Sequence, residues 1–269
     1  IYMPTNLILL GTGNALVTRY YNTCFALQNN NEYFLTDAGG GNGILAQLEK
    51  AHIAMENIRA LFLTHGHTDH ILGVIWVIRL AASLFVRGKH PGLTIYCHDE
   101  CAEKLRAFCR MTLTPKLQAV LDNGVRFVVL KNGDSFQAAG FNCTAFDIYS
   151  TKTKQFGYRA TLPDGQALVC LGDEPYNPLC RQYAQNADWL MSEAFCLYGE
   201  REEFKPYEKH HSTALDAART SQQLNAKHLI LYHTQDNHPA QRKALYTAEA
   251  RQAFSGPVYV PEDLETITL

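Results

Sequence analysis

The sequence predicts an α+β protein, an αββα sandwich in which two β-sheets pack face to face beneath outer layers of helices. Short apolar runs typical of strands come in two groups, and segments of helical spacing lie between them and at the end of each group. The chain has 269 residues, of which 46% are hydrophobic, and is long enough for a large core. It contains no repeat, low-complexity tract or linker, so we expect one domain over residues 1–269.

The first group of strands begins with the apolar run 7–10, which ends in the glycine turn Gly11–Gly13. Another run stops at Asp37, before three glycines, and the residues from Ile71 to Phe85 are apolar at helical spacing. The elements expected here are strands at 7–10, 24–28, 33–36 and 58–63 and helices at about 43–50 and 71–85.

The second group is marked most clearly by the turn Pro163-Asp164-Gly165, which lies between two apolar runs and predicts a β-hairpin. Later apolar runs alternate with segments of helical spacing. The elements expected here are strands near 93–97, 125–130, 135–139, 141–148, 156–162, 166–171, 188–191, 228–232 and 257–260, with helices near 98–109, 176–184, 212–224 and 239–253.

Composition and charge narrow the classes of partner. A formal net charge of −2 provides no overall positive field for nucleic acid. The apolar run 71–85 is interrupted by Arg79 and is shorter than the roughly 18–20 residues that a membrane span needs, so we expect no membrane partner. The segment Ile1–Pro4 lacks the basic region that opens a secretory signal, which favours an intracellular protein.

The eight cysteines are scattered without paired spacing, and most lie inside apolar runs, as Cys170 does. This usage predicts free buried thiols in a reducing compartment and therefore a cytoplasmic location. The group Cys97, His98, Cys101 and Cys109 suggests a separate zinc site, but the segment is more typical of a strand end leading into a helix.

Residues 64–70 read Thr-His-Gly-His-Thr-Asp-His, the densest group of metal-binding side chains in the chain. Imidazole is a common ligand for zinc, iron and manganese, and a carboxylate binds a second ion or orients a water. The group follows a strand-like run and precedes the long apolar helix, so we expect Gly66 to allow a tight turn and Asp69 and His70 to project from the first helical turn. Four potential ligands in six positions are typical of a two-metal site.

Two later residues are candidates for the remaining ligands. Asp173 lies in a glycine turn after the apolar run 166–171, and His233 directly follows the run 228–232. Taken alone, Asp173 is better read as a turn aspartate and His233 as a surface histidine. Beside the dense loop we interpret both as ligands.

This pattern resembles the metallo-β-lactamase superfamily over almost the entire chain. The resemblance implies the fold of that superfamily, with two mixed sheets, and a hydrolase that uses two divalent metal ions, zinc in the first place and manganese or iron as alternatives. The ligands it implies are His65 and His67 for the first ion, Asp69, His70 and His233 for the second, and Asp173 as the bridge between them.

Tyr149 departs from the pattern, because the superfamily normally supplies another histidine to the first ion from this strand end. Three interpretations stay open. Tyr149 binds as a phenolate, which would favour iron or manganese over zinc; the gap is filled by water, Ser150 or Thr151; or the first site is lost and one ion remains.

The segment His211-Ser212-Thr213, with Glu193 upstream and Gly13 near the N-terminus, is similar to ribonuclease Z and its phosphodiesterase relatives. The similarity implies that a metal-activated water, oriented by Asp69, attacks phosphorus while His211, paired with Glu193, protonates the leaving oxygen. Gly13, Ser212 and Thr213 would contact the substrate. Glu193 beside His211 would favour the imidazolium form.

The long arm with which ribonuclease Z clamps tRNA has no counterpart, since only 23 residues separate Tyr149 from Asp173. A small phosphodiester, a cyclic nucleotide or a nucleotide-like ester therefore fits better than tRNA. Lys152, Lys154 and Arg159 form either a phosphate-facing patch or a solvated strand face. The resemblance is also compatible with a homodimer.

Two other functions remain as alternatives. A thioester or lactone hydrolase of the glyoxalase II kind would share the loop and Asp173, although Glu193 and His211 argue against it. The second alternative is a metal-binding protein without enzymatic turnover, in which Tyr149 marks a degenerate first metal site. The presence of His211, Glu193 and Asp69 argues against that reading, because a binding module needs no proton donor.

Overall fold

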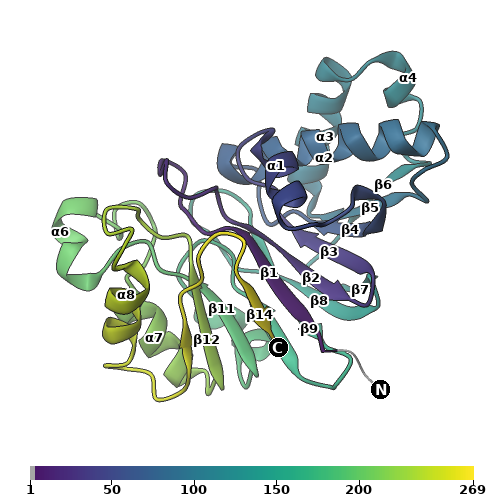
Figure 1. The fold of residues 1–269 in the computed structure, drawn as a ribbon. Helices are drawn as coiled ribbons and strands as arrows, with labels where there is room; N and C mark the ends of the chain where they lie inside the picture. The colour runs from purple at the N-terminus through teal and green to yellow at the C-terminus, as the bar shows by residue number, and fades with distance from the viewer. Residues whose placement is uncertain (1–3) are drawn as a thin grey trace.

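Two seven-stranded sheets pack face to face in the computed structural model, which describes residues 4–269. Helices α1 (Gly43–Lys50), α2 (Thr68–Val86) and α3 (Asp99–Thr112) lie outside the first sheet, and α7 (Ala214–Gln223) and α8 (Arg242–Ala250) lie outside the second (Figure 1). The predicted αββα sandwich is therefore confirmed. The expectation about a secretory signal concerns residues 1–3 in part, and these lie outside the described residues.

The first sheet contains both antiparallel and parallel pairs. Its strands, in spatial order, are β14 (Thr266–Thr268), β1 (Asn6–Gly11), β2 (Cys24–Asn29), β3 (Glu32–Thr36), β4 (Ile58–Phe62), β5 (Leu93–Cys97) and β6 (Val125–Val129). The pairs from β14 to β3 are antiparallel and those from β3 to β6 are parallel.

The second sheet repeats this arrangement without any repeat in the sequence. Its strands, in spatial order, are β13 (Val258–Tyr259), β12 (His228–Tyr232), β11 (Trp189–Glu193), β10 (Ala167–Cys170), β9 (Phe156–Thr161), β8 (Phe141–Asp147) and β7 (Ser135–Ala138). The pairs from β7 to β10 are antiparallel, and those from β10 to β13 are parallel.

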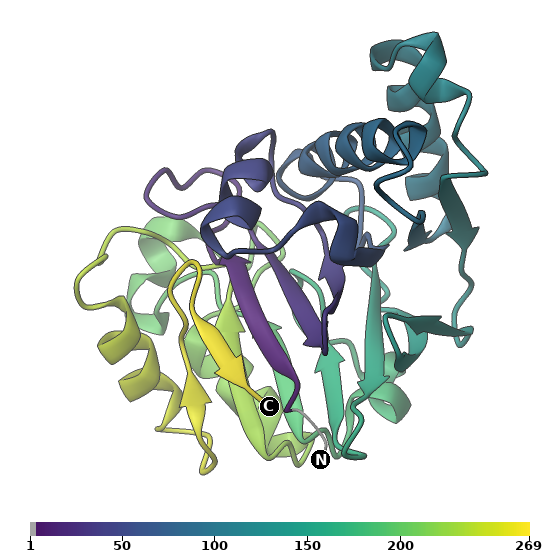
Figure 2. The ribbon, with the colours of Figure 1, turned by 45° about the vertical axis from the view of Figure 1, so that its right-hand side comes forward.

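All strands expected from the sequence are present, and one strand was missed. β14 lies beside β1, so the end of the chain closes the first sheet next to its beginning (Figure 2). Its three residues, Thr-Ile-Thr, are too few for a period-2 pattern to stand out.

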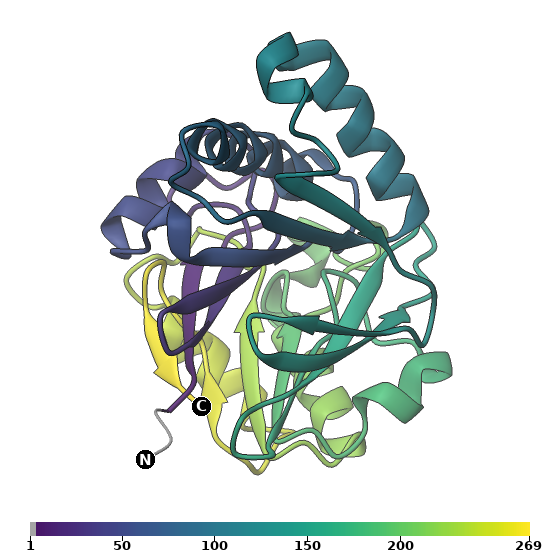
Figure 3. The same cartoon turned by 90° about the vertical axis from the view of Figure 1, so that its right-hand side faces the viewer.

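The helices depart from expectation mainly at short segments. The helix expected at 176–184 is only a 3₁₀ turn, Pro178–Cys180, followed by the short α5 (Arg181–Ala184). Four further short elements were not predicted: α4 (Pro115–Gln118), α6 (Arg201–Phe204) and two 3₁₀ turns, at Met55–Asn57 and Tyr198–Glu200. Helix α3 and the short α4 project beyond the sheets at the top of Figure 3.

Apolar side chains fill the space between the sheets and beneath the helices. Phe34, Phe62 and Tyr158 belong to the cluster between the two sheets, and all three are fully buried. Separate clusters join the first sheet to α1–α3 and the second sheet to α7 and α8. Such burial is the main favourable contribution to folding.

Helix α2 begins at Thr68, so Asp69 and His70 lie in its first turn, as expected, and it ends at Val86. By length and composition alone, its 19 residues with a mean hydropathy of 1.7 would suffice to cross a membrane. Half of that window is buried in the protein, however, where Val74, Val77 and Ile78 pack in the core. The apolar character of the buried half of α2 is thus accounted for by its place in the core.

The polar residues of interest collect at one edge of the sandwich. β3 and β4 are parallel neighbours in one sheet, and β10, β11 and β12 are parallel neighbours in the other. Parallel strands bring their carboxyl ends to the same edge of a sheet. The segments that follow these five strands therefore form the candidate site.

Candidate metal centre

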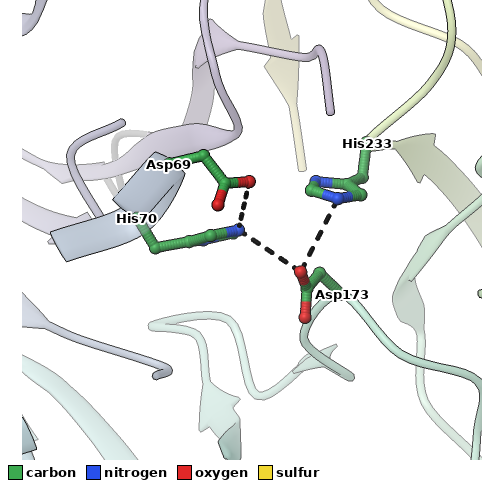
Figure 4. A group of neighbouring side chains, drawn as sticks. All are labelled: Asp69, His70, Asp173 and His233. Atoms are coloured by element: carbon green, nitrogen blue, oxygen red, sulfur yellow. Dashed lines mark ion pairs between the residues drawn. The ribbon is translucent and has the colours of Figure 1, made fainter. Parts of the chain in front are cut away.

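Four buried side chains from three segments converge on one point (Figure 4). Asp69 and His70 lie in the first turn of α2, Asp173 follows β10, and His233 follows β12. Nε2 of His70 lies 3.3 Å from Oδ2 of Asp69 and 3.4 Å from Oδ2 of Asp173. Nε2 of His233 lies 3.6 Å from the same Asp173 oxygen. One ligand atom from each of the four lies within 4.8 Å of those from the others.

A second group shares Asp173 with the first. Nε2 of His65 lies 2.9 Å from Nδ1 of His67 and 3.5 Å from Oδ2 of Asp173. His65 is fully buried and His67 partly buried. Oδ2 of Asp173 thus faces both groups, which is the arrangement expected of a bridging carboxylate.

The local backbone explains why these side chains meet. The chain leaves β4, passes through the loop in an extended conformation at His67, and starts α2 at Thr68. A Cβ at Gly66 would lie 2.8 Å from the side chain of Lys104, so the loop packs closely against α3. Asp69 in the first turn also complements the positive end of the helix dipole.

Burial and neighbouring charges shift the pKa values of these groups strongly. Burial lowers the pKa of His65 well below its usual value. Burial disfavours the charged form of His70 too, but the carboxylates of Asp69 and Asp37 outweigh it and raise its pKa well above the usual range. Burial likewise opposes ionisation of Asp173, while His65 and His70 hold its pKa well below the usual range. In the metal-free protein this pocket therefore retains positive charge on His70.

The donor set fits divalent metal ions. Nε2 of His70 is buried and has no hydrogen-bond partner among the described residues, although it faces two carboxylates. A buried nitrogen of this kind is rare unless a ligand satisfies it. Imidazole and carboxylate donors suit zinc, manganese and iron. The group of Asp69, His70, Asp173 and His233 has the four ligands of a complete site, and the group of His65, His67 and Asp173 has three.

Tyr149 is not brought to the centre in this structure. Its side chain is 38% exposed, and its hydroxyl lies 3.5 Å from Nδ2 of Asn132. The backbone at Tyr149 is left-handed, with φ of 56°. Ser150 donates to Glu174 at 2.6 Å, and Thr151 contacts Nδ1 of His210. This arrangement does not supply the phenolate ligand that one reading of the sequence expected.

Two residues that contact the candidate ligand histidines were missed in the sequence. Asp37, which follows β3, accepts hydrogen bonds from Nδ1 of His70 at 2.7 Å and from the amide of Thr64 at 2.8 Å. Thr23 contacts Nδ1 of His233 at 2.8 Å. Such partners fix the ring orientation of a ligand histidine. Asp37 carried a signal, since it ends the strand next to the one that leads into the ligand loop; Thr23 carried none.

His211 and Glu193 lie beside the centre, as predicted, but the charge state differs from expectation. Nδ1 of His211 lies 3.8 Å from Oε2 of Glu193, and its ring stacks on Phe195 with centroids 4.5 Å apart. Burial raises the pKa of Glu193 to about 8 and lowers the pKa of His211 to about 3. Burial thus disfavours the charged form of both groups, which is the opposite of the imidazolium that the sequence led us to expect.

The predicted substrate contacts are engaged within the protein. The amide of Gly13 donates to the carbonyl of Tyr21 at 3.0 Å. Thr213 is the N-cap of α7 and forms a capping box with Asp216. The amide of Ser212 donates to Oε1 of Glu193 at 2.6 Å. In this structure these donors stabilise the loops around the centre rather than facing it.

Lys152, Lys154 and Arg159, which were considered as a phosphate-facing patch, do not act together in the structure, because each has different surroundings. Lys154 pairs with Asp99 at 2.6 Å, and Arg159 donates to the carbonyl of Tyr183 at 2.9 Å. Lys152 is exposed. Burial is the main cause that lowers the pKa of His67, and the positive charge of Lys152 lowers it further. One cation of the three is left near the centre.

The cysteines are free, as predicted, and all eight are buried. Nε2 of His98 lies 3.2 Å from Sγ of Cys101. Neither residue belongs to a potential metal group in the described part of the chain. The segment is the strand end and helix start that the sequence indicated.

Comparisons with known proteins identify the family and the fold. A family model described as anti-Pycsar protein Apyc1 matches residues 5–253. A ribonuclease Z of Prochlorococcus marinus subsp. pastoris is 25% identical over 316 aligned residues, covering 97% of this chain and 98% of the relative. The metallo-beta-lactamase fold protein YhfI from Bacillus subtilis has a TM-score of 0.79 at 20% identity, covering 98% of this chain and 99% of its own. A diphosphatase from the PhnP family has a TM-score of 0.75 at 18% identity, covering 99% and 98%. The fold is therefore the metallo-β-lactamase fold that the sequence predicted.

Proposed function

The chain belongs to the family of the anti-Pycsar protein Apyc1 and is a metal-dependent hydrolase related to ribonuclease Z. On that premise we propose that it is a phosphodiesterase that cleaves a small phosphodiester, a cyclic nucleotide or a nucleotide-like ester. The observation that carries the proposal is the position of His211, whose ring centroid lies 5.3 Å from that of the candidate ligand His233.

A proton donor at this position suits an ester of phosphoric acid. An alkoxide leaving group has a high pKa and needs a proton as the bond breaks, whereas a thiolate, with a pKa near 8.5, leaves without one. The Glu193 and His211 pair supplies such a donor, buried and held in place by Phe195. This favours a phosphodiester over the thioester of a glyoxalase II-like enzyme and over binding without turnover.

We assign the metal-holding roles to the residues that converge in the structure. Asp69, His70 and His233 would hold one ion, His65 and His67 would hold the other, and Asp173 would bridge the two. When bound, the ions would lower the pKa of a water toward about 7 and stabilise negative charge on the phosphoryl oxygens. Zinc is the ion we propose, with manganese or iron as alternatives.

The remaining steps fall to residues of the chain. Asp69 would accept a hydrogen bond from the attacking water and orient it toward phosphorus. Nε2 of His211 would donate its hydrogen to the leaving oxygen. At the same time, Nδ1 of His211 would take a second proton from the carboxyl group of Glu193. The 3.8 Å between Nδ1 and Oε2 must shorten to a hydrogen bond for this transfer.

The surroundings of the centre favour a small substrate. Between Tyr149 and Asp173 the chain holds only β9, its hairpin turn and β10, so no arm extends from this position. Lys152 and Lys104, whose side chain packs against Gly66, are enough for a single phosphate but do not form an extended track for a polynucleotide. We therefore propose that tRNA is not the substrate.

The location, partners and assembly are part of the same proposal. Eight free buried cysteines support a reducing compartment, and we propose a cytoplasmic protein without a membrane partner. The homodimer that the resemblance suggested is kept as a proposal, and a molecular mass measured in solution tests it against the 30.2 kDa of one chain.

The decisive experiment compares substrate classes on one protein. Metal-stripped protein is reloaded with zinc, manganese or iron and assayed with bis(p-nitrophenyl) phosphate, with 3′,5′-cyclic nucleotides and with an S-acyl glutathione thioester. We expect metal-dependent hydrolysis of the phosphodiesters and no thioester cleavage. Thioester cleavage alone would support the glyoxalase II alternative, and no hydrolysis with any metal would support the non-enzymatic one.

A further inference from the structure

The two oxygens of Asp173 have different surroundings. Oδ2 faces the histidines of the centre, at 3.5 Å from Nε2 of His65, 3.4 Å from that of His70 and 3.6 Å from that of His233. Oδ1 points away from them and accepts a hydrogen bond from Nε2 of Gln155 at 2.6 Å. The orientation of this carboxylate therefore depends on a residue that is not itself a candidate ligand.

Gln155 is held rigidly behind the centre. Its side chain is 0% exposed. Its carbonyl accepts from the amide of Ile148 at 3.1 Å, and the next amide, that of Phe156, donates to the carbonyl of Thr64 at 3.0 Å. The backbone at Gln155 is thus tied to the end of β8 on one side and to the start of the ligand loop on the other.

The chain next to Asp173 leaves room for this side chain. Gly172 has φ of +81°, a conformation that favours glycine, and a Cβ there would lie 2.9 Å from Nε2 of Gln155. The amide nitrogen of Gln155 also lies 3.0 Å from Nδ1 of His65. One buried amide therefore contacts both the bridging carboxylate and a ligand histidine of the first group.

Stability alone does not explain a glutamine at this position. Its Oε1 is buried and has no hydrogen-bond partner among the described residues. An unsatisfied buried carbonyl oxygen is unfavourable, and an apolar side chain of similar size would avoid it. The nitrogen of the amide is the end that has partners, Oδ1 of Asp173 at 2.6 Å and Nδ1 of His65 at 3.0 Å.

We propose that Gln155 is a positioning residue of the metal centre: by holding Oδ1 of Asp173 it keeps Oδ2 directed to both groups of histidines. This inference rests on the proposed function, because it takes Asp173 to be the bridge between two ions. Residues that orient a ligand in this way typically change metal affinity by about 10- to 100-fold when replaced.

Metal affinity tests the inference without reference to catalysis. Q155M removes the amide but keeps the approximate size of the side chain, and Q155E replaces the donor with a carboxylate next to that of Asp173. The matched control is Q47M, since Gln47 is also buried and donates its amide to a backbone carbonyl, that of Leu10. Zinc dissociation constants are measured by competition with a chromogenic chelator, and thermal unfolding is measured on the metal-free proteins.

We expect zinc binding to weaken about 10- to 100-fold in Q155M and further in Q155E, with both groups of ligands affected. Metal-free Q155M should unfold at or above the wild-type temperature, because the unsatisfied oxygen is gone. Q47M should keep the wild-type zinc affinity. If Q155M binds zinc like the wild type, or if it loses affinity only in proportion to lost thermal stability, the positioning role is wrong.

The outcomes also separate this inference from the proposed function. Wild-type protein that binds two zinc ions and cleaves phosphodiesters, together with unchanged affinity in both variants, would overturn only the role of Gln155. Wild-type protein that binds zinc but cleaves no phosphodiester would overturn the proposed function and still leave the effect of Gln155 on zinc binding measurable.

Discussion

Asp37 accepts a hydrogen bond from Nδ1 of His70 at 2.7 Å, and this contact joins the end of β3 to the first turn of α2. Asp37 also accepts from the amide and the hydroxyl of Thr64, both at 2.8 Å. One buried carboxylate therefore fixes both ends of the ligand loop. It directs Nε2 of His70 toward Asp69 and Asp173.

Replacing this carboxylate should weaken metal binding. In Asp37→Asn the negative charge is lost, and one of the two oxygens that accept from Thr64 and His70 becomes an NH₂ group, which cannot accept. We expect zinc affinity to fall about 10- to 100-fold, as is typical when the partner of a ligand histidine is removed. Chelator competition measures the change. Asp164→Asn, in the exposed turn between β9 and β10, is the control and should bind zinc like the wild type; equal affinities in the two variants would contradict the role of Asp37.

The leaving group should decide how much His211 matters. We expect His211→Ala to lose about 10²- to 10⁴-fold in kcat on a phosphodiester with an alkoxide leaving group, the usual range for general acid catalysis. With p-nitrophenolate, which needs little protonation, the loss should be less than about 10-fold. The neighbouring exposed His210→Ala is the matched control. An equal loss on both substrates would show that His211 acts on binding or folding rather than as the acid.

Gly73 should tolerate no side chain, because α2 lies against the chain that follows β3. A Cβ at Gly73 would lie 1.8 Å from the carbonyl oxygen of Ala38, which is backbone and cannot turn aside. We expect Gly73→Ala to destabilise the fold by about 3 kcal/mol, at the upper end of the usual cost of overpacking, or to prevent folding. Urea unfolding checks this against Gly41→Ala, where nothing lies within 4 Å. Equal unfolding midpoints would disprove this tight packing.

His98 should make the fold sensitive to acid. Burial lowers its pKa from 6.5 to about 4, so the unfolded chain binds a proton in this pH range that the folded chain does not. The free energy of unfolding therefore gains fully from the neutral, buried His98 above pH 6.5. This gain, of up to about 3 kcal/mol, is lost as the pH falls toward 4. The free energy of unfolding of metal-free His98→Asn should fall less steeply over this interval than that of the wild type. A constant difference between the two proteins from pH 8 to pH 4 would rule this out.

Much of the fold could be predicted because its signals are local. Apolar runs bounded by turns located the strands within one or two residues at most ends, and the helix expected near 212–224 is α7 (Ala214–Gln223). The helix expected at 176–184 was wrong in its first half. The apolar residues of this segment have helical spacing, but the structure forms a 3₁₀ turn there, which Asn177 caps. β14 was missed because a three-residue strand is stabilised by its pairing with β1, a partner more than 250 residues away.

The candidate ligands were visible for a similar reason. The loop at 64–70 holds four of them within six positions, and Asp173 and His233 each follow an apolar strand. Their convergence required only that parallel strands end at one edge of the sandwich. The roles of Asp37 and Gln155 were not predicted, because they depend on contacts with residues that are distant in the sequence rather than on sequence spacing.

The sequence by itself determined which side chains are able to hold metal and which elements carry them. Both depend only on residue type and on patterns among residues that are close together in the chain. Only the tertiary structure decided how those side chains are oriented and charged. Tyr149 turns toward Asn132, burial raises the pKa of Glu193 to about 8, and Gln155 donates to the outer oxygen of Asp173. The physical reason is that burial and hydrogen-bond partners, which set orientation and pKa, come from segments distant in the chain.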